Sequence, residues 1–170
     1  MDINQHNIEK TILIIAKDPT LLPERKTTWS VCLDLCVSDD TIINPGKITI
    51  VSAGIKTVIP HWRHSKVYAR SWLPTKQWVT LANAVAIIDS DYRWEYRLQL
   101  RNISDQVVKL GKWTRVCQIE FCPTYIPENQ TIWDDIAPGL KLICDTDLYD
   151  NCDKIFPTDR WIWWLHSTGK

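Results

Sequence analysis

The chain consists of short apolar runs separated by turn-forming residues, and this pattern restricts it to a β-rich fold. The runs are rich in valine, isoleucine and threonine, which favour the pleated, half-buried surface of a strand. Two of them, Tyr96–Asn102 and Arg115–Cys122, alternate apolar and polar residues, as strands with one buried face do. The other runs are Thr11–Ala16, Val31–Val37, Lys47–Ile59 and Val85–Ile88.

Many short strands at close spacing predict an all-β jelly roll or barrel of short mixed strands. No stretch of ten or more residues has a helical period, and Gln130–Ile136 suits one short turn at most. A length of 170 residues fits one domain. We expect a β domain at residues 1–128, an extended connection at residues 129–156 and a flexible C-terminal arm at residues 157–170.

Charge and cysteine content exclude several classes of function. The formal net charge is zero, so a basic stripe that grips a nucleic-acid backbone is not expected. The first ten residues are polar and no apolar run reaches the length of a membrane span, which makes the cytoplasm the expected location. The six cysteines form no CxxC pair and no zinc-ligand spacing, so we expect buried thiols.

Polar residues at one predicted reversal suit the recognition of a base and the activation of a water. The segment Leu81–Tyr92 places Asn83 before the reversal and Asp89 after three apolar residues. An asparagine offers both a donor and an acceptor to a base edge, and a carboxylate at a strand end suits the orientation of a water. From these residues alone, Asp89 and its neighbours are equally well explained as ordinary turn formers.

Two further segments carry groups that bind phosphate. The forked guanidinium of Arg70 and the hydroxyl of Ser71 can both donate hydrogen bonds to phosphate oxygens. The last residues, from Arg160 onward, add Ser167 and Thr168. Each segment taken alone is also consistent with an ordinary polar surface or an adhesive aromatic tail.

Together, in this order and spacing, the segments resemble the trimeric dUTPases, whose five motifs all have counterparts here. The resemblance covers about residues 11–125 and 157–170. The motif counterparts and the side chains they keep are WSVCLDL with Asp34; Ala69-Arg70-Ser71-Trp72 with Arg70 and Ser71; ANAVAIIDSDYRW with Asn83, Asp89 and Tyr92; WTRVCQ with Arg115 and Gln118; and RWIWWLHSTG with Arg160, Ser167 and Thr168.

The resemblance implies hydrolysis of dUTP to dUMP and pyrophosphate in a homotrimer, with sites at the subunit interfaces. It implies that Asn83 recognises uracil, that Tyr92 packs under the sugar and that Asp89 orients the attacking water. Asp34 would hold waters of a Mg²⁺ carried by the triphosphate. The groups implied to hold the phosphate chain are Arg70, Ser71 and Gln118, with Arg160, Ser167 and Thr168 closing over the γ-phosphate. Leu165 stands where the family has a phenylalanine that stacks on uracil.

Tryptophan occupies many of the positions where the family has glycine, while Cys32, Ala84, Ala86 and His166 occupy others. The chain has 10 tryptophans and 5 glycines, and nine tryptophans fall on such positions: Trp29, Trp62, Trp72, Trp78, Trp94, Trp113, Trp161, Trp163 and Trp164. An indole obstructs both a positive φ and the approach of a backbone amide to phosphate. We hypothesise that these codons are UGA, read as glycine in the source and written as tryptophan. Nine restored glycines would bring glycine to about 8% of the chain, near the ordinary roughly 7%.

Two other functions are consistent with parts of the sequence. A catalytically impaired binding or regulatory protein on the same fold would use the tryptophan-rich surface for a partner, although the retained site side chains argue against it. A dCTP deaminase shares the fold but needs a glutamate proton shuttle, and the corresponding residue here is Gln99, which cannot serve.

Overall fold

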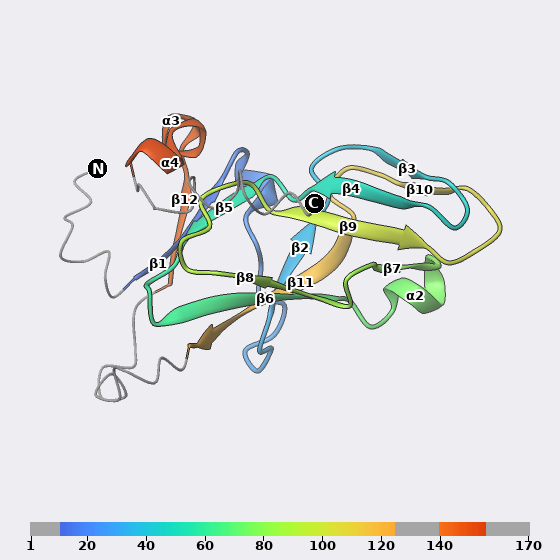
Figure 1. Cartoon of the computed structure of the whole chain (residues 1–170), viewed down its shortest axis with the longest axis horizontal. Coiled ribbons are helices and arrows are strands. Elements are labelled where there is room, and N and C mark those ends of the chain that lie inside the picture. The colour runs from blue at the N-terminus through green and yellow to red at the C-terminus, as the bar shows by residue number, and fades with distance from the viewer. Residues whose placement is uncertain (1–10, 125–139, 156–170) are drawn as a thin grey trace, which may run out of the picture.

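A computed structural model of the chain describes residues 11–124 and 140–155, which are mostly β-strand (Figure 1). The all-β prediction is confirmed. The strands are β1 (Ile12–Ala16), β2 (Leu33–Cys36), β3 (Thr41–Ile43), β4 (Ile48–Ser52), β5 (Ile55–Val58), β6 (Arg63–Ala69), β7 (Val79–Leu81), β8 (Val85–Ile88), β9 (Arg97–Asn102), β10 (Val108–Leu110), β11 (Arg115–Pro123) and β12 (Leu140–Cys144). The helical turns are η1 (Pro19–Leu21), α2 (Leu73–Lys76), α3 (Thr146–Asp150) and α4 (Cys152–Ile155).

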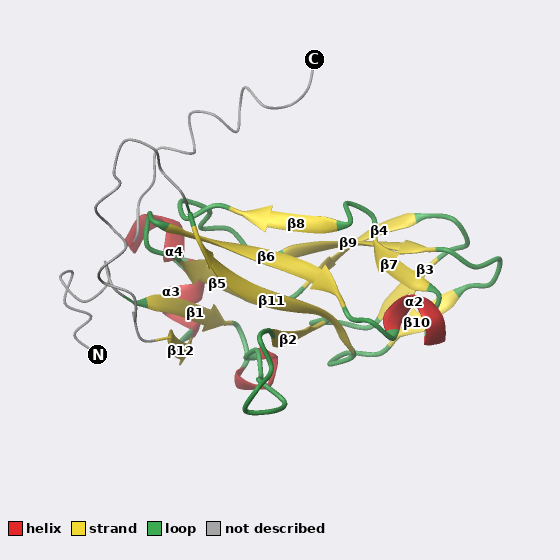
Figure 2. Ribbon diagram, turned by 90° about the horizontal axis from the view of Figure 1, so that it is seen from below, coloured by secondary structure: helices red, strands yellow, loops and turns green. Residues whose placement is uncertain are grey.

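The strands form four small sheets in the orders β2-β11-β6-β8, β4-β9-β7, β12-β1-β5 and β10-β3. Figure 2 shows the first of these, with β6 and β11 side by side in the middle of the molecule. All strand pairs are antiparallel except β1 and β12, which run parallel. The mixture of directions agrees with the predicted short mixed strands.

The predicted alternation in the ninth strand follows from its position over the core. Leu98 and Leu100 are buried while Arg97, Gln99 and Arg101 are exposed, because successive side chains of a strand point to opposite faces. Buried side chains of β1, β2, β6, β9 and β11 meet in one main hydrophobic cluster.

The long run Lys47–Ile59 is divided into β4 and β5 by a tight turn at Gly54. Its φ is +65°, and a Cβ there would lie 2.4 Å from Cδ1 of Leu21. Only glycine fits such a position without displacing its neighbours, so this turn depends on one of the few glycines of the chain.

The segment predicted as an extended connection is more structured than expected where the structure describes it. Residues 140–155 form β12, α3 and α4, and β12 pairs with β1 from Ile12 opposite Leu140 to Ala16 opposite Cys144. The short helix predicted at Gln130–Ile136 and the arm at residues 157–170 lie outside the described residues. In the described part of the chain, no helix is long and apolar enough to cross a membrane.

Candidate active site

Three of the predicted phosphate-site side chains lie together on neighbouring strands. Asp34 on β2 is opposite Gln118 on β11, and Gln118 is opposite Tyr68 on β6, two residues before Arg70. The Arg70 guanidinium donates to the Asp34 carboxylate, and Nη1 of Arg115 lies 3.5 Å from the same oxygen. The sheet register therefore brings residues from three separate motifs to one place.

These side chains line a pocket of about 390 Å³. Its walls are Lys26, Ser30, Val31, Cys32, Asp34, Arg70 and Gln118. Burial raises the pKa of Asp34, and the adjacent Arg70 offsets part of this rise. A pocket with two cations, one carboxylate and an amide suits a phosphate chain that brings a metal ion with it. Lys26 was not among the predicted residues, since a lysine in a loop carries no signal besides its charge.

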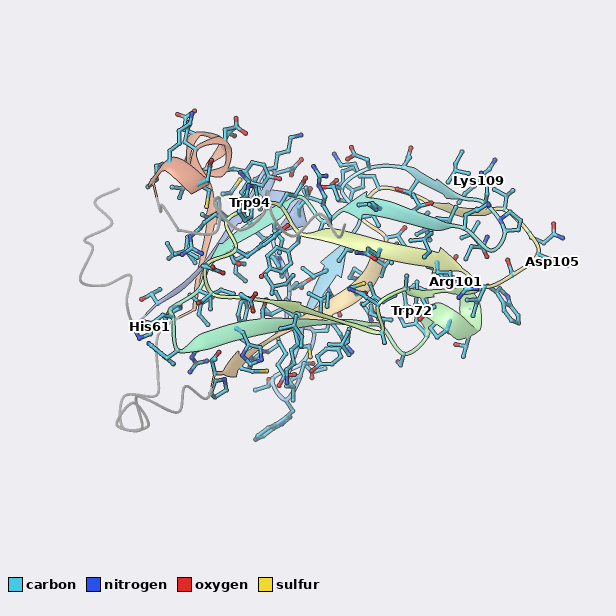
Figure 3. The ribbon with its side chains drawn as sticks, viewed as in Figure 1. His61, Trp72, Trp94, Arg101, Asp105 and Lys109 are labelled. Carbon is cyan, nitrogen blue, oxygen red and sulfur yellow. The ribbon has the colours of Figure 1, made fainter. Side chains whose placement is uncertain are left out.

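Two more residues of the second motif follow Arg70 in the chain. Ser71 directly follows Arg70 and is exposed, so its hydroxyl is available to a ligand. Trp72 starts α2, and the Arg70 guanidinium lies 5.6 Å from the centre of its ring. Trp72 lies beside α2, whereas Trp94 lies in the connection from β8 to β9 (Figure 3). Both tryptophans thus stand next to residues of the candidate site.

The predicted nucleoside residues lie at the two ends of β8. Asn83 is exposed in the turn between β7 and β8, where its carbonyl accepts from the Val85 amide at 2.6 Å. Asp89 is exposed just past the other end of β8, and its carbonyl accepts from the Tyr92 amide at 3.1 Å. The carboxylate of Asp89 thus stands at a strand end, as the sequence predicted.

Tyr92 is held in place by its hydroxyl and its ring. The hydroxyl donates to the backbone carbonyl of Glu95 at 3.0 Å. The ring packs edge-on against Trp94 and Tyr96, with centroids 5.3 and 6.2 Å away. Tyr96 is fully buried and bonds Thr57 and Ser65 through its hydroxyl. The Tyr92 ring therefore rests on a rigid base.

The phosphate cluster and Asp89 lie far apart within one chain. One line of paired residues crosses the sheet β8-β6-β11-β2: Val85, Tyr68, Gln118 and Asp34. Three strand spacings therefore separate Val85 from Asp34, a distance of about 14 Å. Ile88 is opposite Ser65, which is opposite Phe121. Asp89, one residue further on and four after Val85, is thus displaced a further 13 Å, roughly, along the strands.

Two of the nine tryptophans at family glycine positions have backbone angles that favour glycine. Among the described residues, three non-glycine residues have positive φ: Trp78 at 55°, Ala84 at 61° and Trp113 at 67°. Trp78 and Trp113 are also 56% and 54% exposed, so neither is needed to fill the core. A bulky side chain at such φ is strained, and glycine would relieve the strain at both positions.

The remaining predicted site residues, Arg160, Leu165, Ser167 and Thr168, lie outside the described residues. Within residues 11–124 and 140–155, no group of three or more histidine, cysteine, aspartate or glutamate side chains is placed to hold a metal ion. A Mg²⁺ at this site would therefore need ligands from the substrate in addition to Asp34.

Comparison of the sequence with known proteins identifies relatives of this chain. The sequence model of the dUTPase family matches residues 18–137. The deoxyuridine 5'-triphosphate nucleotidohydrolase of Wolbachia pipientis wMel is 35% identical over 116 residues, which cover 67% of this chain and 73% of that protein. The enzyme of the same name from Hydrogenobaculum is 35% identical over 108 residues, covering 63% and 75%.

Solved structures show the same fold. The dUTPase from Streptococcus mutans superposes with a TM-score of 0.63 at 32% identity, covering 65% of this chain and 91% of that one. The Staphylococcus bacteriophage 80alpha dUTPase has a TM-score of 0.62 at 14% identity, covering 72% and 96%. The second likeness concerns the fold alone.

Proposed function

The chain belongs to the dUTPase family, and on this premise we propose that it hydrolyses dUTP to dUMP and pyrophosphate. The observation that carries the proposal is the cluster of Asp34, Arg70 and Gln118, which three different motifs supply to one pocket. A protein that only kept the fold would have no need of a cation, an amide and a carboxylate converging there.

The chemical step needs a water aimed at the α-phosphorus, and Asp89 is the group we assign to it. Its carboxylate is exposed at the end of β8, where a water can hydrogen-bond to it. As the water oxygen attacks, Asp89 accepts the proton, the bond from the α-phosphorus to the bridging oxygen breaks, and pyrophosphate leaves. Positioned acid–base groups contribute about 10²–10⁴-fold to such rates.

The phosphate chain is held by Arg70, Ser71 and Gln118. The guanidinium and hydroxyl donate to phosphate oxygens, and the amide of Gln118 donates from the neighbouring strand. We propose that Asp34 binds waters of a Mg²⁺ that enters with the triphosphate, since Mg²⁺ usually combines one or two carboxylates with substrate phosphates. When bound, the metal ion neutralises charge on the phosphates.

Base and sugar are assigned to the other end of the site. Asn83 and the turn around it would pair with the uracil edge, and the Tyr92 ring would pack under the deoxyribose and reject a 2′-hydroxyl. The arm would bring Arg160, Ser167 and Thr168 over the γ-phosphate and Leu165 over the uracil, excluding water during the reaction.

A homotrimer completes this site. Because Asp34 and Asp89 are far apart in one chain, a ligand that contacts both must lie between chains. Exposed apolar side chains on β4 (Ile48, Ile50) and on β8 (Val85, Ile87) provide surface for such contacts. The proposed division of the chain is a β domain at 1–128, a connection at 129–156 that adds β12, α3 and α4 to the folded body, and an arm at 157–170.

The cytoplasm is the proposed location. All six cysteines are free thiols, and Cys36, Cys117 and Cys152 are buried. Unpaired thiols suit a reducing compartment, where disulfides are rare.

A nucleotide panel tests the proposed activity. The chain is produced with the residues that its gene's codons specify at the nine tryptophan positions. It is then incubated with dUTP, UTP, dCTP or dTTP in the presence of Mg²⁺. We expect dUMP and pyrophosphate from dUTP, no more than traces of product from the others, and loss of activity with EDTA. Binding of dUTP without turnover would favour the impaired binding protein, and ammonia release from dCTP would favour a deaminase.

A further inference from the structure

The first strand has apolar side chains on both faces, and the second face is covered by residues 140–155. Ile12, Ile14 and Ala16 join the main core. Leu13 and Ile15 form a separate buried cluster with Val58 of β5 and with Leu148, Tyr149 and Cys152 of α3 and α4. Figure 1 shows α3 and α4 above the end of β12, beside β1 and β5. This helical segment is therefore part of the folded body.

Tyr149 extends from this cluster to Glu95, in the connection between β8 and β9. Its hydroxyl donates to Oε1 of Glu95 at 2.7 Å. The Lys56 ammonium lies 4.7 Å from the centre of its ring and also donates to its backbone carbonyl. Burial and the bond to Glu95 raise the pKa of Tyr149, so the hydroxyl keeps its proton and remains a donor at neutral pH.

Glu95 joins this tyrosine to the candidate sugar-binding residue. Its carboxylate also accepts from the Ser52 hydroxyl on β4, and its backbone carbonyl accepts from the Tyr92 hydroxyl. The next residue, Tyr96, is locked by its amide to the Ile55 carbonyl at 2.9 Å. Ser52 and Tyr149 thus both donate to the same carboxylate oxygen, Oε1 of Glu95.

We propose that Tyr149 is a positioning residue for sugar selection, which holds Glu95 and through it the Tyr92 hydroxyl and ring. The inference rests on the proposed function, because it assigns Tyr92 to the deoxyribose. It goes beyond that function because Tyr149 lies after residue 137, where the match to the family ends. The proposed support for the sugar site thus comes from residues that follow the matched region.

The Tyr149→Phe variant removes the hydroxyl and keeps the packed ring. We expect the ratio of kcat/KM for dUTP to kcat/KM for UTP to fall about 5-fold, the loss typical of one hydrogen bond. The KM for dUTP should rise while kcat changes little, since the proton transfer is assigned to Asp89 and not to the residues that Tyr149 holds. Glu95→Ala should reproduce this effect. Glu95→Gln should largely restore discrimination, because its amide oxygen still accepts a hydroxyl proton.

A matched variant separates positioning from stability. Asp145 caps α3 by accepting from the Leu148 amide at 2.9 Å, so Asp145→Ala should lower Tm by loosening the helix but leave the dUTP/UTP ratio unchanged. If Tyr149→Phe keeps the wild-type ratio, or if Asp145→Ala lowers it equally, the proposal is overturned. Failure of the unmodified chain to hydrolyse dUTP would instead overturn the proposed function.

Discussion

The two halves of the candidate site are held by different kinds of interaction. In the phosphate half, Asp34, Arg70 and Gln118 are placed by the register of three strands and by an ion pair. In the nucleoside half, Asn83 and Asp89 lie on turns, and Tyr92 is held through Glu95. The phosphate half therefore depends on side-chain charge inside the sheet, whereas the nucleoside half depends on turn geometry and on distant support.

The largest effect should come from the nucleoside half. Asp89→Asn keeps the shape of the turn but removes the proton acceptor, so kcat should fall about 10³-fold with dUTP binding retained. Pyrophosphate release measures the rate, and equilibrium binding measures the affinity. Asp105→Asn is the control, since Asp105 is exposed in the loop between β9 and β10, at the far end of the molecule (Figure 3). Equal losses in both variants would remove Asp89 from the mechanism.

Loss of Arg70 should affect both catalysis and folding. Arg70→Ala should lower kcat/KM for dUTP about 50-fold by removing a charged phosphate contact. It should also lower the free energy of unfolding by about 2 kcal/mol, because the Asp34 side chain is 11% exposed and loses its main partner. Arg101→Ala removes an exposed arginine of β9 and should change neither quantity.

A double variant sharpens the structural part of that prediction. Adding Asp34→Ala to Arg70→Ala removes the unpaired carboxylate, so the pair should be less destabilising than the sum of the two single changes. Strictly additive losses, measured by urea unfolding, would show that the two side chains do not interact.

The turns should become more stable when glycine replaces tryptophan at positive φ. Trp78→Gly and Trp113→Gly should each raise the free energy of unfolding by about 1 kcal/mol by relieving backbone strain. Trp113 loses one bond in the exchange, from its Nε1 to the Thr20 hydroxyl at 2.8 Å. Trp29 is 92% exposed and lacks positive φ, so Trp29→Gly should not stabilise. UGG codons at the nine positions would reject the UGA hypothesis regardless of these energies.

The smallest predicted effect is a loss of stability at alkaline pH, caused by the buried Cys117 thiol on β11. Burial raises the pKa of the Cys117 thiol to about 12, so the folded chain keeps a proton that the unfolded chain releases. Stability is therefore complete below the thiol's unfolded pKa and falls as pH rises, by about 0.8 kcal/mol between pH 7 and pH 9. Cys117→Ala should remove this part of the slope in urea unfolding, and an unchanged slope would assign it to other groups.

The sequence predicted the phosphate half better than it predicted what supports the nucleoside half. Periodicity located β9 and β11, and motif spacing selected the side chains that the register then brought together. Periodicity did not show that residues 140–155 would cover the outer face of β1, since that pairing joins residues more than a hundred positions apart. The Tyr149–Glu95 bond depends on the same long-range contact, so no local pattern indicated it.

A subunit-mixing experiment tests most directly the central claim that the two halves meet between chains. Arg70→Ala and Asp89→Asn chains, each nearly inactive, are co-expressed with different tags in equal amounts, and mixed oligomers are isolated. If each site takes one half from each of two neighbouring chains of a trimer, every mixed trimer keeps one intact site in three, so about a third of wild-type dUTP hydrolysis should return. Mixed oligomers that remain as inactive as either variant alone would contradict the account.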